Sequence, residues 1–362
     1  MISAAAHIEL DITALRHNVA KVRELAPGAK LMAVIKANAY GHGLITVANY
    51  LAAQVDAFVV ARIDAALSLR EAGVQTKILV LQGVSQTDEL ELLQRYQFEA
   101  VIHSESQVNL LEASDIEAPI TGWLKIDTGM NRLGIHPEQF AAVLKRLQRC
   151  KSVQAEINFM THFANADDRL DNKTSRQLQL FNDTTKNYSG EKTSANSAAI
   201  IAWPEAHQEW VRPGLMLYGA SPLLKQTAEQ LDLQPVMSLY SRLIAIKSVK
   251  AGDTVGYGGT WQAAKDSSIG IISIGYGDGY PRYAKQGTPV LINNRRVPLI
   301  GRVSMDMISV DLTGHTEIKS GDQVMLWGDG LPVEEIAECA GTIPYTLLCG
   351  ITRRVQVIVK DK

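Results

Sequence analysis

The sequence predicts an α/β fold, with an N-terminal (β/α)8 barrel followed by a mostly antiparallel β C-terminal domain. Over the first two-thirds of the chain, eight short strand-like runs alternate with amphipathic segments. This number and this alternation suit a closed parallel barrel, with an open doubly wound sheet as the competing arrangement. From about residue 232, β-branched runs are separated by glycine and turn residues, which is typical of antiparallel strands.

The eight runs of the predicted barrel follow an opening strand, "HIELD", at residues 7–11. Between them lie helical patterns such as "RIDAALSLREAG" and "HPEQFAAVLKRLQRC", in which apolar residues recur at helical spacing. The seventh run is the weakest of the eight strand predictions, because it is polar and short. In order, the runs are "LMAVIKA" (31–37), "DAFVVA" (56–61), "KILVLQG" (77–83), "FEAVIH" (98–103), "GWLKIDTG" (122–129), "AEINFMTHF" (155–163), "KTSANS" (192–197) and "VRPGLMLYG" (211–219).

The predicted domains are residues 1–231 for the barrel and 232–362 for the β domain, and the first ten or so residues could pair with the β domain. A chain of 362 residues is long enough for two domains. In the second domain "PVEEIAECAG" is helical in pattern. The strand-like runs there are "YSRLIAIKSVKAGDTVGYGG", "SIGIISIGYGDGYP", "TPVLINNRRVPLIGRVSMDMISVDL" and "GDQVMLWG".

Composition excludes several classes of partner. The formal net charge of −2 argues against a nucleic-acid-binding protein, which usually carries a basic face. No stretch approaches the roughly 20 apolar residues that span a bilayer, so no membrane partner is expected. The opening "MISAAAHIELD" has no basic n-region and no adequate apolar h-region, so we expect a cytoplasmic location. The three cysteines lack C-x-x-C spacing, and no metal site is predicted.

Polar residues gather where the predicted barrel strands end, which is where barrels carry their functional groups. Lys36 closes an apolar strand, and burying an unpaired ammonium is expensive. Its head could reach solvent, or it could have a chemical task. The polar residues at or just beyond strand ends are Lys36, Tyr40, Lys125, Asp127, Arg132, His162, Asn196, Ser197 and Arg212.

A phosphate site is plausible after the seventh and eighth runs, where barrels often hold phosphate. Ser197 and the backbone of Gly214 and Leu215 lie there, and glycine lets an anion approach main-chain N–H groups closely. No G-x-x-x-x-G-K-[ST] sequence is present, which argues against a nucleoside triphosphate. A phosphorylated cofactor beside a buried lysine suggests pyridoxal 5′-phosphate, held as a covalent Schiff base by Lys36.

The segment "VIKANAYGHG" resembles the cofactor-lysine signature of the alanine racemases. Further blocks resemble that family in order, from near residue 30 to near residue 355, so nearly the whole chain is covered. The resemblance implies a barrel with a β domain and a pyridoxal-phosphate-dependent isomerase, an amino-acid racemase that interconverts L-alanine and D-alanine. The blocks are "LKIDTGMNRLG", "THFANAD", "SANSAA", "VRPGLMLYG", "VGYGGTW", "IGYGDGYPR", "GRVSMDM" and "TIPYTLLCGITRRV".

The resemblance also implies a two-base mechanism. Lys36 would handle the proton of the D-enantiomer, and Tyr257 that of the L-enantiomer. Tyr257, with Met305 and Asp306, would reach into the barrel of a partner subunit, so a homodimer with shared active sites is expected. A free tyrosine hydroxyl has a pKa of about 10, so a base of this kind needs cations around it, and His162 is one candidate. The family supplies D-alanine for peptidoglycan or consumes it for alanine metabolism, and the sequence leaves that choice open.

The other site residues take their roles from the same resemblance. Arg132 would contact the substrate carboxylate and the phenolic oxygen of the cofactor, and the Met305 N–H would contact the carboxylate too. Arg212 would donate to the pyridine nitrogen, and Lys125 would be carbamylated or neighbour a chloride. Serine tolerance stays open. The expected phosphate contacts are Tyr40, Ser197, Gly214, Leu215 and Tyr345, His162 completes the cofactor site, and Asn196, Tyr276, Arg282 and Asp306 are supporting residues.

Three alternatives remain beside this interpretation. A barrel-type amino-acid decarboxylase uses the same cofactor and usually carries a cysteine near its C-terminus, as Cys349 is here, but Arg212 and Tyr257 argue against it. A broad-specificity racemase commonly has a secretory signal. A non-enzymatic cofactor carrier would have the barrel without a β domain.

Overall fold

The computed structural model describes residues 6–116 and 118–361. The chain divides into two compact units, a β-rich unit of residues 6–17, 218–221 and 227–361, and a barrel unit of residues 18–217 and 222–226. The N-terminal strand belongs to the β-rich unit because its hydrogen bonds are to strands of that unit. The domain boundary expected between residues 231 and 232 stays a proposal.

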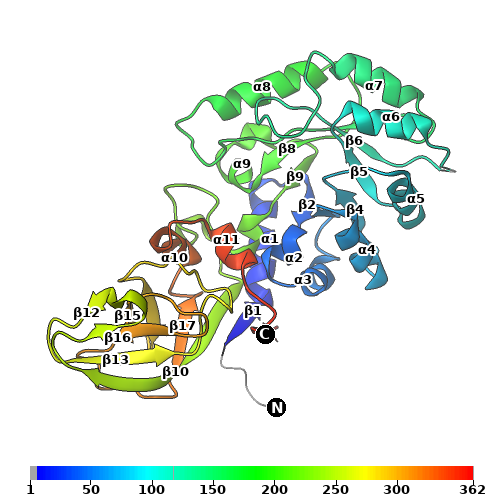
Figure 1. Ribbon diagram of the computed structural model, residues 1–362. Helices are drawn as coiled ribbons and strands as arrows, with labels where there is room; N and C mark the ends of the chain where they lie inside the picture. Colours follow the sequence, from blue (N-terminus) through cyan, green and yellow to red (C-terminus); the bar gives the residue numbers. More distant parts are fainter. Residues whose placement is uncertain (1–5, 117, 362) are drawn as a thin grey trace. The chain divides into compact units, whose positions relative to one another are not determined.

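The barrel unit is a closed ring of eight parallel strands (Figure 1). The ring closes because β2 pairs with β9, with Lys30 opposite Trp210 and Leu31 opposite Val211. This closure confirms the predicted barrel and excludes the open sheet. The strands are β2 (Lys30–Val34), β3 (Ala57–Val60), β4 (Lys77–Val80), β5 (Glu99–Ile102), β6 (Gly122–Lys125), β7 (Asn158–Met160), β8 (Lys192–Asn196) and β9 (Trp210–Arg212).

Most barrel strands are covered on both faces, so their sequences are apolar almost throughout, and the polar β8 is the exception. In β3, for example, all four residues are buried. The helices show the one-sided pattern of an outer layer: in α7, Phe140, Val143, Leu144 and Leu147 are buried, at the spacing of one helical face. The helices between strands are α1 (Ile12–Leu25), α2 (Lys36–Tyr40), α3 (Leu44–Leu51), α4 (Ile63–Glu71), α5 (Thr87–Tyr96), α6 (Glu105–Ala113), α7 (Phe140–Arg149), α8 (Lys173–Thr185) and α9 (Ser197–Ala202).

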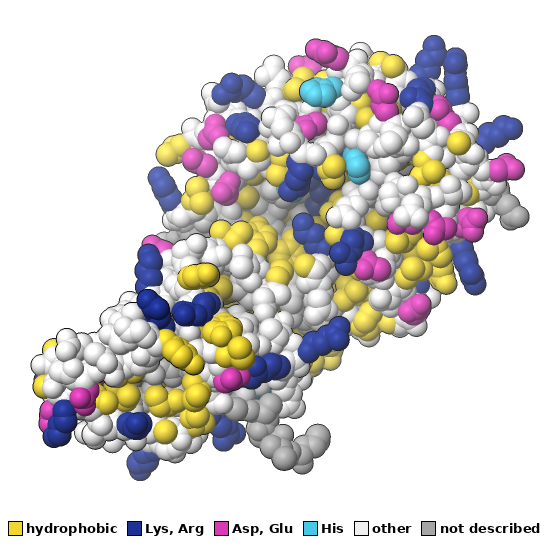
Figure 2. Space-filling view, viewed as in Figure 1, with side chains coloured by type: hydrophobic (Ala, Val, Ile, Leu, Met, Phe, Trp, Pro, Cys, Tyr) yellow, Lys and Arg dark blue, Asp and Glu magenta, His cyan; other side chains and the backbone are white. Residues whose placement is uncertain are grey.

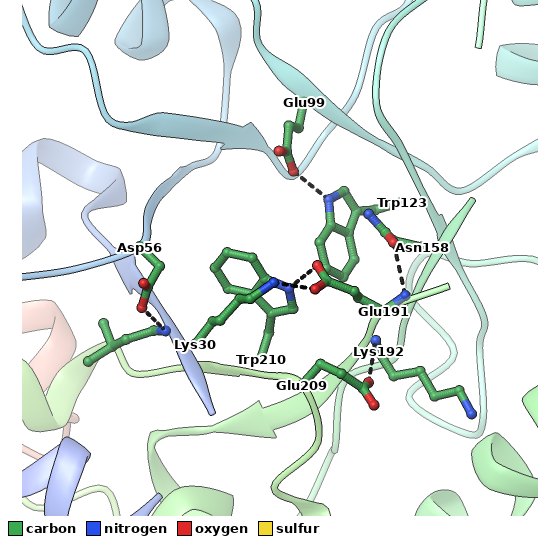
Figure 3. Close-up of polar contacts among 10 residues, drawn as sticks. Lys30, Asp56, Glu99, Trp123, Asn158, Glu191, Lys192, Glu209 and Trp210 are labelled. Carbon is green, nitrogen blue, oxygen red and sulfur yellow. Dashed lines mark hydrogen bonds and ion pairs between the residues drawn. The ribbon is translucent and has the colours of Figure 1, made fainter. Parts of the chain in front are cut away.

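The N-terminal ends of the barrel strands are closed by tryptophans bonded to carboxylates (Figure 3). Trp210 Nε1 donates to Glu191 Oε2 over 2.6 Å, and Glu191 also pairs with Lys30. Trp123 Nε1 donates to Glu99 Oε2 over 2.7 Å. In barrels of this kind the functional residues lie at the C-terminal ends of the strands. We therefore assign these contacts at the N-terminal ends to the stability of the fold.

The β-rich unit contains an eight-stranded sheet in the order β13-β16-β15-β14-β17-β10-β1-β18. The strand β1 (His7–Asp11) lies antiparallel to β10 and parallel to β18. This sheet confirms the predicted C-terminal domain of mostly antiparallel strands. Its other strands are β10 (Met237–Val249), β13 (Ser267–Ile272), β14 (Pro289–Ile292), β15 (Arg295–Ile300), β16 (Ile308–Asp311), β17 (Gln323–Trp327) and β18 (Gln356–Lys360), beside the pair β11 (Thr254–Val255) and β12 (Trp261–Gln262) and the helices α10 (Val333–Cys339) and α11 (Pro344–Cys349).

Short 3₁₀ helices occur at η1 (Pro204–Ala206), η2 (Leu215–Tyr218), η3 (Glu229–Leu231) and η4 (Tyr257–Gly259). Within residues 6–116 and 118–361, none of the helices combines the length and apolar composition that crossing a membrane requires. Figure 2 shows basic and acidic side chains interspersed over the visible surface, with hydrophobic side chains gathered on part of the β-rich unit.

Candidate active site

Lys36 lies at the C-terminal end of a barrel strand, but it does not close that strand as the sequence suggested. The strand β2 ends at Val34, and Lys36 opens α2. The next four residues have φ between 52° and 55°, which is the left-handed region and costs a residue with a side chain roughly 1–2 kcal/mol. Hydrogen bonds hold this turn, including Ala39 N to Ile35 O at 2.9 Å and Leu44 N to the Asn38 side chain at 2.8 Å. The position of Lys36 is therefore fixed by a strained backbone rather than by a strand.

The turn brings Tyr40 against Gly214, which follows the last barrel strand. A Cβ atom on Gly214 would lie 2.6 Å from Tyr40 Oη, so only glycine fits beneath the phenol. Ser197 completes the group, since its Oγ accepts hydrogen bonds from Gly214 N at 2.7 Å and Met216 N at 3.4 Å. Asn196 fixes the start of α9, with Oδ1 accepting from Ala199 N. Leu215 begins η2 directly after Gly214.

Arg212 ends β9 and is only 5% exposed. Nη1 donates to Thr193 Oγ1 over 2.6 Å, and Nη2 donates to Thr161 O over 2.8 Å and to Ser194 O over 3.2 Å. Burial lowers the pKa of Arg212 to about 10, so the guanidinium remains charged near neutral pH. It is a rigid cation held in one orientation.

Three further cations, Lys36, Lys125 and Arg132, share this end of the barrel with Arg212. Burial, followed by the charges of Arg212, Arg132 and Lys36, lowers the pKa of Lys125 to about 8, and Asp127 acts in the opposite direction. The Asp127 side chain is committed to its own loop, where Oδ1 accepts from the N–H groups of residues 129–131 at 2.9–3.1 Å. The site therefore has an excess of positive charge.

His162 follows β7 and lies in the same group, with Nδ1 3.4 Å from Arg212 Nη2. Burial is the largest cause that holds the pKa of His162 well below its usual value, and the charges of Arg212, Lys125, Arg132 and Lys36 act in the same direction. The imidazole is neutral in this structure. Burial and the surrounding cations both oppose a positive charge on this imidazole, which argues against His162 as the cation expected beside the Tyr257 hydroxyl.

The remaining predicted residues lie in the β-rich unit. Tyr257 in η4 is 68% exposed and Met305 is 53% exposed. Backbone hydrogen bonds join the segments of Tyr276 and Met305, with Tyr276 N donating to Ser304 O and Gly277 N to Met305 O. Arg354 ties Asp306 to Asp278, with contacts of 2.7 Å and 3.2 Å.

Two more predicted residues accompany these. The Arg282 guanidinium carbon lies 6.0 Å from the centre of the Tyr276 ring, which is within reach of a cation–π interaction. Tyr345 lies in α11 and is 38% exposed. Each unit thus holds a separate subset of the predicted residues, and Tyr257, Met305 and Tyr345 of the β-rich unit are exposed.

Sequence reasoning missed the buried polar residues that orient these groups. Thr193, Thr161 and Gln177 are fully or almost fully buried and bonded to the site residues or their loops. A threonine at the second position of a predicted barrel strand was the available indication for Thr193. Gln177 lies within a helix, and nothing in the sequence pattern distinguishes it from a surface glutamine.

The residues of the barrel unit fit pyridoxal 5′-phosphate. Ser197 offers a hydroxyl whose oxygen accepts from Gly214 N at 2.7 Å, and the space between Gly214 and the Tyr40 phenol is one that a side chain on Gly214 would fill. The charges of Lys36, Arg132 and Arg212 act on Lys125, and all four cations act on His162, so the group suits an anion. Lys36 is the primary amine through which an aldehyde could be attached.

Comparison with known families matches both parts of the chain. Residues 10–222 match the family described as "Alanine racemase, N-terminal domain", and residues 236–359 match "Alanine racemase, C-terminal domain". Together these matches cover most of the sequence.

Individual relatives carry the same name. The chain is 50% identical over 349 residues to the alanine racemase of Shewanella sediminis, covering 96% of this chain and 97% of the relative. It is 48% identical over 358 residues to "Alanine racemase, biosynthetic" of Escherichia coli O6:H1, covering 99% of both chains. Among solved structures, the biosynthetic alanine racemase of Pseudomonas aeruginosa has a TM-score of 0.96 at 41% identity, over 99% of this chain and 100% of that chain.

Proposed function

The chain belongs to the alanine racemase family, and we propose that it interconverts L-alanine and D-alanine with pyridoxal 5′-phosphate attached to Lys36 Nζ. One observation carries the cofactor proposal: four cations converge where the barrel strands end, and the same end carries the Ser197 hydroxyl, which Gly214 N holds in place. When bound, the cofactor delocalises the negative charge that develops at the substrate α-carbon.

The proposed proton transfers use two side chains on opposite faces of the substrate. Lys36 Nζ takes up or returns the α-proton for the D-enantiomer, and Tyr257 Oη does so for the L-enantiomer. Two bases are needed because racemisation removes a proton from one face and returns one to the other. Each must lie within hydrogen-bond reach of the α-carbon's proton when the substrate is bound.

Arg212 holds its own proton throughout. Its guanidinium is fixed by Thr193, Thr161 and Ser194, and its pKa of about 10 makes transfer of a proton to a pyridine nitrogen unfavourable. It therefore donates a hydrogen bond to that nitrogen without protonating it. An unprotonated pyridine ring withdraws electrons less strongly. This limits side reactions such as transamination, in which the proton returns to an atom other than the substrate α-carbon.

Substrate binding would use both units. Arg132 pairs with the alanine carboxylate, and the Met305 N–H donates to it from the β-rich unit of a second subunit, where Asp306 supports that segment. Tyr345 joins Tyr40 at the phosphate, and Tyr276 and Arg282 line the approach. Tyr257 and Met305 are exposed, so both are accessible to a second subunit, as the proposed homodimer requires.

Three further features belong to the proposal. The Lys125 amine, with its lowered pKa of about 8, is either carbamylated or paired with chloride, and either anion would offset the charge of Arg132. The enzyme works in the cytoplasm. Its product D-alanine serves peptidoglycan synthesis, or the reverse direction serves alanine breakdown.

The test is exchange of the α-hydrogen of each alanine enantiomer in D₂O, followed by NMR together with release of CO₂. A racemase exchanges the hydrogen and inverts the centre, whereas a decarboxylase releases CO₂. Tyr257→Phe should impair exchange from L-alanine far more than from D-alanine, and equal losses would contradict the two-base mechanism. Mixing the inactive Lys36→Ala and Tyr257→Phe proteins should restore activity in hybrid dimers if the sites are shared, and no recovery would contradict the sharing.

A further inference from the structure

We propose that Gln177 is a positioning residue for the reaction, because its buried side-chain amide ties together the two loops that follow β6 and β7. These loops carry Arg132 and His162 respectively. The inference rests on the proposed function, since it assigns Gln177 a task in that same site. Gln177 itself acts only through the residues whose backbone it holds.

The first contact of Gln177 is with the loop after β7. The side chain projects from α8 and is 2% exposed. Its Oε1 accepts from Ala164 N at 3.0 Å, and its Nε2 donates to His162 O at 3.2 Å. One side-chain amide therefore bonds the backbone carbonyl before Phe163 and the backbone N–H after it. A neighbouring β-strand would satisfy these two groups in the same way. This fixes the peptide on which the His162 imidazole stands.

The second contact is with the loop after β6. Gln177 Nε2 also donates to Thr128 Oγ1 at 3.3 Å, and Thr128 Oγ1 lies 2.8 Å from Thr161 Oγ1. Thr161 Oγ1 donates to Ile126 O at 2.9 Å. Since the Thr161 hydroxyl has one proton and gives it to Ile126, the Thr128 hydroxyl must donate to Thr161 and accept from Gln177. All three side chains are buried.

This chain of donors has one direction, and it requires an amide at position 177. A carboxylate there could still accept from Ala164 N, but it would face two acceptors, His162 O and Thr128 Oγ1, with nothing to donate. The network continues to the buried cation of the site, because Arg212 Nη2 donates to Thr161 O. Arg212, His162 and the loop of Arg132 are thus held in one arrangement by buried polar contacts around Gln177.

The same fold contains a matched arrangement between two other loops of the barrel. Gln107 on α6 is 6% exposed, and its Nε2 donates to Gln82 O at 3.0 Å and to Val84 O at 3.1 Å. Its Oε1 accepts from His103 N at 2.8 Å. Gln107 therefore joins the loops after β4 and β5 with the same chemistry. Those loops carry none of the residues assigned to the reaction, so Gln107 is the control for the structural effect of losing such an amide.

The experiment compares Gln177→Met with Gln107→Met in the cofactor-loaded enzyme, by kinetics and by hydrogen exchange with mass spectrometry. Each change removes three hydrogen bonds at nearly constant volume. For Gln177→Met we expect amides of residues 127–133 and 161–166 to exchange at least tenfold faster, and kcat/KM for alanine to fall at least tenfold. For Gln107→Met we expect faster exchange at residues 82–85 and 103 only, with kcat/KM within twofold of the parent.

Two further variants keep the test decisive if Gln177→Met does not fold. Thr128→Val removes one hydroxyl from the same network and should lower kcat/KM, whereas Thr128→Ser keeps the hydroxyl and should restore it. Equal losses in the two glutamine variants, or parental kcat/KM in Gln177→Met, would overturn the positioning role. If the parent enzyme does not racemise alanine, the proposed function fails, while the exchange data still report whether Gln177 joins the two loops.

Discussion

The hydroxyl of Thr193 lies 2.6 Å from Nη1 of Arg212, on the neighbouring strand of the barrel, and donates its own proton to Trp210 O at 3.0 Å. Both side chains are buried. An ordinary threonine thus supplies one of the acceptors that hold the buried cation in place.

Removing this hydroxyl should affect both stability and activity. Thr193→Val leaves a buried guanidinium N–H without its acceptor, which costs about 1–3 kcal/mol, and kcat/KM should fall at least tenfold as Arg212 loses its orientation. Urea unfolding and alanine kinetics measure the two effects. Thr193→Ser keeps the oxygen and should stay close to the parent, and if it matched the valine variant, the hydroxyl would not be the cause.

A side chain at Gly214 should disturb the proposed phosphate site. Gly214→Ala places Cβ 2.6 Å from Tyr40 Oη, and such overpacking costs about 1–3 kcal/mol. The unfolding midpoint of the cofactor-free protein should fall accordingly. Adding Tyr40→Phe removes the clashing oxygen and should recover most of that loss, so a double variant no more stable than Gly214→Ala would contradict the contact.

Lys125 should destabilise the cofactor-free protein near neutral pH. Its pKa is lowered from 10.5 to about 8, so between these values the unfolded chain binds a proton that the folded chain lacks, and stability rises with pH. Below about pH 8 Lys125 is protonated in the folded state, and the full free-energy cost of burying its charge remains. Lys125→Met should therefore stabilise the protein at pH 7 by about 1–3 kcal/mol. The gain should shrink by pH 10, and a gain independent of pH would show that the charge is not responsible.

His42 should weaken the fold in mild acid. Its Nδ1 lies 2.9 Å from Tyr40 O and 3.0 Å from Ala39 O, in the left-handed turn after Lys36. Burial lowers the pKa of His42 from 6.5 to about 4, although the bonds to these carbonyls oppose it. The unfolded chain gains a proton first as pH falls, so stability decreases between these values by at most about 3 kcal/mol.

The measurement for His42 is the unfolding free energy at pH 7.5 and pH 5. His42→Gln can still donate to the two carbonyls but does not titrate, so its loss between the two values should be smaller than that of the parent. The exposed His136 serves as the control, because His136→Gln should keep the parental pH dependence. If both variants behaved alike, His42 would not be the group that titrates.

Much of the architecture could be predicted because it depends on patterns that are local in sequence. All eight runs overlap barrel strands, although the strands are shorter: in the run at 211–219 the strand ends at Arg212, before Pro213, which has no N–H to donate. The polar seventh run is a strand since Thr193 and Ser194 bond to the Trp210 and Ala206 carbonyls. The family resemblance is confirmed by the matches over residues 10–222 and 236–359.

The site was predicted less completely, for physical reasons. Four successive residues in the left-handed region cannot be expected from "KANAY", because residues with a side chain rarely adopt that region, and then as single residues. The pKa of His162 is lowered by its burial and then by four cations that lie far apart in the sequence, and neither cause is visible in the sequence pattern. The task of Gln177 depends on loops that a helix meets only after folding.

The strand β1 has a consequence for how this protein is made. Its partners are β10 and β18, with His7 opposite Tyr240 and Gln356. A nascent chain emerging from the ribosome therefore holds β1 unpaired while the entire barrel is synthesised, and closing so distant a pair is slow. During that interval the edge of β1 is open to chaperones or to pairing with another chain, so the yield of folded enzyme should respond to translation speed and to chaperone supply.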